Sequence, residues 1–337
     1  MTTTRPSEPI EPTVAPRRSA VRWLRLAAVP VVTVGLLWYF LHRLPPGTIA
    51  DSYRHASPAP LAISVAAVAV FMAARAWRYR ILLGAGATAA PPAGPTAAVT
   101  VAAWWPGLLL PGIAADAAFV YLAGRRLDTT LVRAGGAAVA ARVLDVVSLL
   151  AIGLVTAPLA GARLPWFVWA LATLALVASV ALMAGLRRRR FRAPLLALLA
   201  RVPGGKRIGA RAERALEELG GGRHLVGLVV ATALARVATA VQYTALFAAL
   251  GVTVTIWQAW FALSFRTLLL AIPIQGLAGL GTTQLWWTAA LTVMGFPAQR
   301  AETVGFQIHL LDLSVVVPAS FIGGAVLLLV YRRRKPS

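Results

Sequence analysis

Residues 272–284 read Ile-Pro-Ile-Gln-Gly-Leu-Ala-Gly-Leu-Gly-Thr-Thr-Gln and interrupt an apolar stretch, 257–296. Proline removes a backbone donor and clashes inside a helix, and glycine lets the chain turn. A second apolar stretch, 96–122, contains Pro106-Gly107 and Pro111-Gly112. We therefore predict that each stretch breaks near its middle. The arms beside Pro111 are too short to cross about 30 Å of hydrocarbon, so re-entrant hairpins are expected.

Longer apolar runs flank these hairpins. A spanning helix needs about 20 such residues. Six segments approach that length: 24–42, 60–74, 134–157, 166–186, 224–250 and 303–330. The chain of 337 residues is 59% hydrophobic and only 13% charged, which excludes a soluble enzyme and a disordered chain. We expect an all-α integral membrane protein with about six full transmembrane helices and two broken helical hairpins.

The basic residues predict the topology. The net charge is +22, and such an excess can indicate nucleic-acid binding. With a cytoplasmic N-terminus and hairpins that return to their own side, cytoplasmic segments carry 26 Lys and Arg and outer segments carry 4. If each hairpin stretch crossed once, the numbers would be 13 and 17. Because cytoplasmic loops hold the excess of basic residues, we expect a cell-membrane protein with both termini cytoplasmic and no nucleic-acid partner.

The order of elements repeats within one membrane domain. Residues 60–157 and 224–330 each read span, hairpin, span, and the predicted topology gives them opposite orientations, as in many transporters. Asp145 and Asp312 occupy corresponding positions in the two halves. The expected domains are a disordered, Pro-rich N-terminus (1–22), a polytopic membrane domain (23–331) with a basic cytoplasmic linker (187–223), and a basic tail (332–337).

Ionised residues at membrane depth are the candidate site. Each costs at least about 2.5–3.5 kcal/mol at a helix centre. Six are expected there, with charges that sum to zero: Asp116, Arg142, Asp145, Arg236, Arg266 and Asp312. Arg142 and Asp145 are three residues apart and share a helical face, and His309 and Asp312 repeat that spacing. These pairs either lock the helices together or form a polar site for a charged substrate or a proton.

The break in the second hairpin is a candidate anion site. Backbone N–H groups at a helix start bind anions. Small and hydroxylated residues open the second arm: Gly276, Gly279, Gly281, Thr282, Thr283, followed by Gln284. This segment could cradle a phosphate, or it could be a tight turn needed for packing. The chain has no cysteine and four histidines without a ligand-spaced cluster, so neither a metal nor a cofactor is expected.

Several motifs resemble one family over roughly residues 60–330. They are Arg75-Ala-Trp77-Arg78, Leu110-Pro111-Gly112 followed by Asp116, Arg142-Val-Leu-Asp145, and Pro273 with Gly276-Leu-Ala-Gly279-Leu-Gly281-Thr282-Thr283. They look like the lysylphosphatidylglycerol synthase transmembrane-domain family, also called flippase-like domain proteins. The resemblance implies a membrane domain that moves a lipid between leaflets. In larger members a soluble domain makes an aminoacylated lipid; we expect no such domain, no catalytic residues and no synthase activity here.

The chain departs from the family pattern at several positions. Ala114-Ala115 replaces Gly-Gly, Phe119 replaces a basic residue, Ala141 an acidic one, and Gln284 a glutamate. These differences argue against proton coupling and against a substrate shared with the better-known members.

A lipid translocase is therefore the leading hypothesis. Its substrate would be an anionic phospholipid or a polyprenyl-phosphate-linked lipid. One alternative is a non-transporting scaffold for partner proteins that make envelope lipids or glycans. Another is a multi-span glycosyltransferase, although the outer segments offer only Asp51 and Glu302 as carboxylates. A small-solute transporter is a third. No ATP-binding motif is present, so energy would come from a gradient, a partner or no source.

Overall fold

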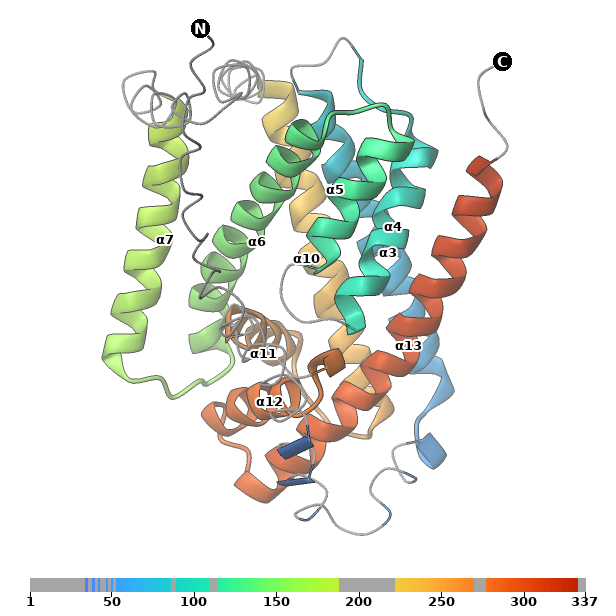
Figure 1. Cartoon of the computed structure of the whole chain (residues 1–337). Coiled ribbons are helices and arrows are strands. Elements are labelled where there is room, and N and C mark those ends of the chain that lie inside the picture. The colour runs from blue at the N-terminus through green and yellow to red at the C-terminus, as the bar shows by residue number, and fades with distance from the viewer. Residues whose placement is uncertain are drawn as a thin grey trace, which may run out of the picture.

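A computed structural model describes residues 34–35, 38–39, 42, 47, 50, 53–85, 89–109, 114–187, 222–269 and 277–332. The longer regular elements within these ranges are all helical (Figure 1). They are α3 (Pro58–Gly84), α4 (Ala93–Leu109), α5 (Ala114–Arg126), α6 (Leu131–Leu159), α7 (Trp166–Arg187), α10 (Gly222–Ala249), α11 (Ile256–Leu269), η1 (Leu277–Gly279), α12 (Thr282–Val293) and α13 (Ala298–Arg332). The predicted all-α class is confirmed.

Four of these helices are long and apolar enough to cross a membrane. They are α3, α6, α10 and α13, and they correspond to four of the six predicted spans. Helix α7 covers the fifth predicted span, but its apolar part, Trp166–Ala181, is shorter. Most of the remaining predicted span, 24–42, lies outside the described residues. Residues 1–22, 188–221 and 333–337 lie outside them as well. A count of six spans remains a prediction.

Helix α3 is longer than the sequence predicted. The expected span ended at residue 74 because a charged side chain at membrane depth is costly. The helix instead continues to Gly84 and carries Arg75 and Arg78 with it. The predicted end is wrong because Arg78 is buried against a carboxylate of a neighbouring helix, Asp145. Two arginines that the topology argument assigned to a cytoplasmic segment therefore lie within the helix bundle.

The structure divides both interrupted stretches into separate helices, and the expected break points within 110–113 and 270–276 lie outside the described residues. Helix α4 ends at Leu109 and α5 begins at Ala114, whereas α11 ends at Leu269 and α12 begins at Thr282. Helix α4 continues through Pro106, so the Pro106-Gly107 pair does not end it. The longest arm, α4, has 17 residues and a length of about 26 Å, which is less than the roughly 30 Å of a hydrocarbon core. Re-entry into the membrane remains a prediction.

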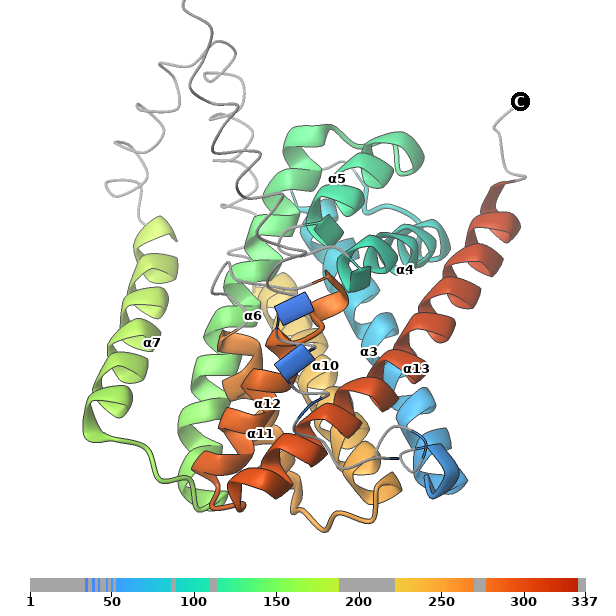
Figure 2. The ribbon, with the colours of Figure 1, turned by 60° about the horizontal axis from the view of Figure 1, so that its bottom comes forward.

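The two hairpins lie toward opposite ends of the molecule. Helices α4 and α5 contact each other in the upper half of Figure 1, and α11 and α12 contact each other in the lower half. Figure 2 shows the same separation after rotation. The long helices α3, α6, α10 and α13 run past both. This arrangement is the one that an inverted repeat would produce, and the repeat itself remains a prediction.

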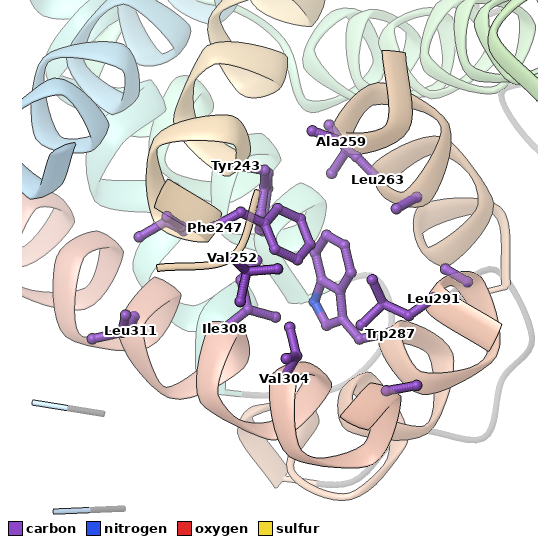
Figure 3. Packing of buried hydrophobic residues seen from close by; sticks show 14 of the residues in the cluster. Tyr243, Phe247, Val252, Ala259, Leu263, Trp287, Leu291, Val304, Ile308 and Leu311 are labelled. Carbon is purple, nitrogen blue, oxygen red and sulfur yellow. The ribbon is translucent and has the colours of Figure 1, made fainter. Parts of the chain in front are cut away.

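The largest apolar core surrounds Trp287 of α12. Figure 3 shows its indole ring enclosed by Phe247 and Tyr243 of α10 and by Val304 and Ile308 of α13. The apolar side chains of helix α7 are much less buried than those of this core. The helix contacts α6 and exposes apolar side chains around much of its surface. A helix that is apolar all round and not covered by protein is suited to lipid. The core thus fixes the second hairpin against α10 and α13.

Candidate functional site

Asp145 lies in the middle of α6, 14 residues from the helix start, and binds two arginines. Arg78 of α3 donates a forked pair of hydrogen bonds to the two carboxylate oxygens, at 2.7 and 3.1 Å. Arg236 of α10 donates to the same carboxylate through Nη2, and its Nε donates to Ser148 at 2.9 Å. The side chains of Arg78 and Arg236 are only 3% and 8% exposed. One carboxylate therefore joins three long helices.

A second carboxylate, Asp116 of α5, lies beside the same helices. Arg142 of α6 donates from Nε to it at 2.6 Å, and the Nη2 atom of Arg75 lies 3.9 Å from its other oxygen. The guanidinium of Arg75 also lies over the ring of Trp104, 4.7 Å from the centroid, and donates to the Tyr79 hydroxyl at 3.3 Å. The first hairpin is thereby attached to α3 and α6 through charge as well as packing.

We call these six residues the arginine cluster: Arg75, Arg78, Asp116, Arg142, Asp145 and Arg236. Four guanidinium groups face two carboxylates, so the cluster carries a net charge of +2. Uncompensated charge at this depth is expensive, because the surroundings have a low dielectric constant. The side chain of Arg142 is 53% exposed, in contrast to its largely buried neighbours. Arg142 is therefore the most exposed of the four cations of the cluster.

Among the described residues, the hydrogen-bond donors to Asp312 of α13 are neutral. Gln242 and Tyr243 of α10 donate to its two oxygens, each at 2.8 Å. The ring of Tyr243 lies 5.0 Å from that of Trp287, and the guanidinium of Arg266 lies 5.7 Å from the Trp287 centroid. One positive and one negative charge thus lie near the rings of Tyr243 and Trp287.

Some polar atoms near the rings of Tyr243 and Trp287 are buried without a hydrogen-bond partner among the described residues. Gln284 is completely buried, and neither its oxygen nor its nitrogen is bonded. His309 is 2% exposed and lies against the backbone of Ala278. The Nε atom of Arg266 is unbonded as well. An unpaired buried group costs about 1–3 kcal/mol, so such a concentration needs an explanation. We call Gln242, Tyr243, Arg266, Gln284, His309 and Asp312 the Asp312 cluster.

The turn before α12 is tight and left-handed. Ala278, Gly279 and Gly281 have φ values of 52°, 69° and 81°. A Cβ atom on Gly279 would collide with the Thr283 hydroxyl and would lie 3.7 Å from Cε1 of His309. Glycine is therefore required at 279, and His309 faces this turn. Gly276 lies outside the described residues.

The predicted pairing within α6 is wrong. Arg142 and Asp145 share a helical face, but Arg142 binds Asp116, and Asp145 binds Arg78 and Arg236. Spacing along one helix shows which side chains share a face, but it cannot show which neighbouring helix offers a closer partner. The parallel expectation for His309 and Asp312 fails for the same reason, because Asp312 takes its hydrogen bonds from α10.

Sequence reasoning also missed four members of the two clusters: Arg75, Arg78, Gln242 and Tyr243. The two arginines were treated as the end of a span, and the other two as part of an apolar run. A signal was available, since Arg75, Arg78 and Tyr79 follow helical spacing with no proline or glycine between them and residue 83. Among the described residues, no group of three or more His, Cys, Asp or Glu side chains could hold a metal ion.

Comparison with known proteins gives one result. The family model for the lysylphosphatidylglycerol synthase TM region matches residues 23–334, which is nearly the whole chain. Searches of curated proteins and of solved structures found no significant match. The match agrees with the four apolar helices and with the motifs around Asp116, Asp145 and the second hairpin. The protein therefore belongs to the family of the lysylphosphatidylglycerol synthase transmembrane region.

Proposed function

We propose that this protein moves an anionic lipid between the leaflets of the cytoplasmic membrane. The lipid is a phospholipid or a polyprenyl-phosphate-linked carrier, and both present a phosphate. The observation that carries the proposal is the net charge of +2 on the arginine cluster, with Asp145 and Arg236 near the middle of α6 and α10. Family membership supports a lipid-related role but does not specify transport.

The chemistry of the cluster suits a phosphate. Guanidinium groups present planar, forked donors that match phosphate oxygens, and their charge is permanent. The two aspartates neutralise half of the four arginines, so an incoming anion compensates the remainder. The head group would then sit among the arginines, while the acyl or prenyl chains stay in the bilayer beside the exposed apolar surface of the bundle.

Arg142 is the proposed entry point. Its side chain is half exposed although its Nε already binds Asp116, so its remaining donors can reach a lipid phosphate. Arg75 and Arg78 lie deeper and are held in place by Tyr79, Trp104 and Asp145. This order places one half-exposed cation in front of buried ones, which favours transfer of the head group inward.

Transport accounts for the site better than catalysis does. Asp116 and Asp145 accept charged hydrogen bonds from arginines, so they are poorly suited to act as general bases or nucleophiles. We propose that the two hairpins are re-entrant, that 60–157 and 224–330 form an inverted repeat with alternating access, and that both termini are cytoplasmic. The proposal includes no ATP hydrolysis and no cofactor.

Reconstitution in liposomes tests this function. The vesicles would contain fluorescent phosphatidylglycerol, fluorescent phosphatidylcholine or a labelled polyprenyl phosphate, and an impermeant quencher would report exchange between leaflets. We expect faster exchange of a phosphate-bearing anionic lipid than of phosphatidylcholine. Arg142→Gln should remove most of that acceleration. Arg163→Gln, which changes an exposed loop arginine, is the matched control and should retain it. Equal rates of exchange in the wild type, Arg142→Gln and Arg163→Gln would refute the proposal. The absence of accelerated exchange with either anionic probe would refute it as well.

A further inference from the structure

We infer that the arginine cluster selects a lipid that ends in a phosphomonoester, whose single phosphate carries two negative charges, over a lipid with a phosphodiester head group. The inference rests on the proposed function and deepens it, because it names the class of lipid that the same site would bind. A polyprenyl monophosphate and phosphatidic acid belong to the first class. Phosphatidylglycerol belongs to the second.

The charges of the arginine cluster form one electrostatic unit and not two separate ion pairs. Arg75 joins the two carboxylates, because its Nη2 atom lies 3.9 Å from Asp116 and its positive charge also attracts Asp145. The three other guanidinium groups each bind one of these carboxylates. The excess of two positive charges is therefore concentrated in one place, and a compensating anion must supply two negative charges there.

A phosphomonoester supplies both charges on one phosphorus atom. At pH 7 it carries a charge of about −1.5 to −2 and presents three strong acceptor oxygens. A phosphodiester carries a single negative charge and has one unesterified oxygen fewer, so the cluster around it would keep one uncompensated positive charge. Because the dielectric constant at this depth is low, that remaining charge costs free energy that the monoester avoids.

The cluster also has unused donors for the additional oxygen. The Nε atom of Arg78 is buried and unbonded among the described residues, on a side chain that is only 3% exposed. Arg142 donates to Asp116 through Nε, and its two Nη groups remain for a ligand. The Oδ1 atom of Asp116 accepts no hydrogen bond, but Arg75 compensates its charge. Buried donors without a partner are rare in native structures, and a phosphate oxygen can accept from such a group.

Protonation of the lipid should change this preference between pH 8 and pH 5. The second pKa of a phosphomonoester is about 6, so the monoester carries mainly two charges at pH 8 and mainly one at pH 5. Among the described residues, the charged and titratable groups around the site are Arg75, Arg78 and Tyr79 of α3, Asp116 of α5, Arg142 and Asp145 of α6, and Arg236 of α10, and α4 has none. None of them is a histidine, the side chain that ordinarily changes its charge in this range.

Calorimetric titration of the full chain in a non-ionic detergent tests the selectivity. The probes are dihexanoyl phosphatidic acid and its methyl ester, dihexanoyl phosphatidylmethanol, which differ only by the group that removes the second charge. We expect the wild type to bind phosphatidic acid about tenfold more tightly than the methyl ester at pH 8. At pH 5 the two affinities should agree within about threefold. This comparison uses the unaltered protein, so it does not depend on the folding of a variant.

Variants locate the selectivity in the cluster. Arg142→Gln lowers the excess to one positive charge, so the preference at pH 8 should fall to about threefold or less, whereas Arg142→Lys should keep most of it. Arg163→Gln, in an exposed loop, is the matched control and should keep the full preference. It removes the same charge from the chain as Arg142→Gln, so it separates the cluster from general attraction by a protein of net charge +22. The unfolding midpoint of each variant would be recorded.

Separate outcomes distinguish this inference from the proposed function. Equal affinity for the two lipids at pH 8, or a preference that is the same at pH 5, would overturn the selectivity, and accelerated exchange in liposomes would then still support transport. A tenfold preference in binding without accelerated exchange would refute transport and keep the selectivity. Inorganic phosphate, titrated in the same way, should bind more weakly than phosphatidic acid. Equal affinity for the free ion would overturn the assignment of the site to a lipid.

Discussion

Asp145 of α6 and Asp312 of α13, which the sequence predicts to correspond, have very different surroundings. Asp145 is held by two arginines and belongs to a cluster with an excess of two positive charges. Asp312 is held by an amide and a phenol, beside polar groups that have no partner among the described residues. One aspartate thus lies in a cluster dominated by charge, and the other in a cluster dominated by neutral hydrogen bonds.

The difference bears on the anion binding that we propose for the arginine cluster. In the arginine cluster, positive charge is permanent and the ion pairs fix it in space, so attraction for an anion is always present. In the Asp312 cluster, the charges of Arg266 and Asp312 are opposite, so the cluster has no excess of positive charge.

The largest effect should come from Asp145→Asn. The change leaves Arg78 and Arg236 buried without a negative charge, which should lower the free energy of unfolding by about 3–5 kcal/mol. The measurement is thermal or denaturant unfolding in detergent. Asp128→Asn, at an exposed turn position with φ of 49°, is the control and should change little. A loss no larger than that of the control would show that the ion triplet does not hold the three helices together.

The turn of the second hairpin gives the next largest effect. Gly279→Ala should lower the free energy of unfolding by about 2–3 kcal/mol, through the left-handed backbone and the collision with Thr283. Gly251→Ala is the matched control, since Gly251 has a similar φ of 67° but open space around it. The difference between the two variants measures the tightness of the turn. Equal losses would mean that the turn can relax.

Asp312→Asn should have a smaller effect than Asp145→Asn. Asparagine keeps one acceptor for Gln242 or Tyr243, and no buried cation loses a directly bonded carboxylate. We expect a loss of about 1–2 kcal/mol in the same unfolding measurement. If this variant were as unstable as Asp145→Asn, the contrast between a charged and a neutral cluster would be wrong.

The smallest effect should have the opposite sign. Gln284→Leu replaces two unpaired buried polar atoms with apolar ones of similar size, so the protein without ligand should become more stable by up to about 1 kcal/mol. The unfolding midpoint, compared with that of Gln299→Leu, provides the test. A destabilised variant would show that Gln284 has a structural partner.

The helices were more predictable than the site. Apolar runs near residues 134–157, 224–250 and 303–330 marked α6, α10 and α13, and the proline and glycine residues marked both hairpin breaks. These features are local, because apolar length and backbone chemistry act within a few residues. The end of α3 could not be placed in this way, because its continuation past Arg75 depends on partners far away in the sequence.

The sequence by itself determined that the protein is helical, that it is suited to a bilayer, and that its polar residues at membrane depth are few. Hydropathy and the cost of exposing backbone to lipid are sufficient for that. Only the tertiary structure decided that Asp145 binds Arg78 and Arg236, that Arg142 binds Asp116, and that Gln284 remains unpaired. Partners of a buried charge are chosen by helix packing, which brings together residues up to 91 positions apart and leaves no trace in local spacing.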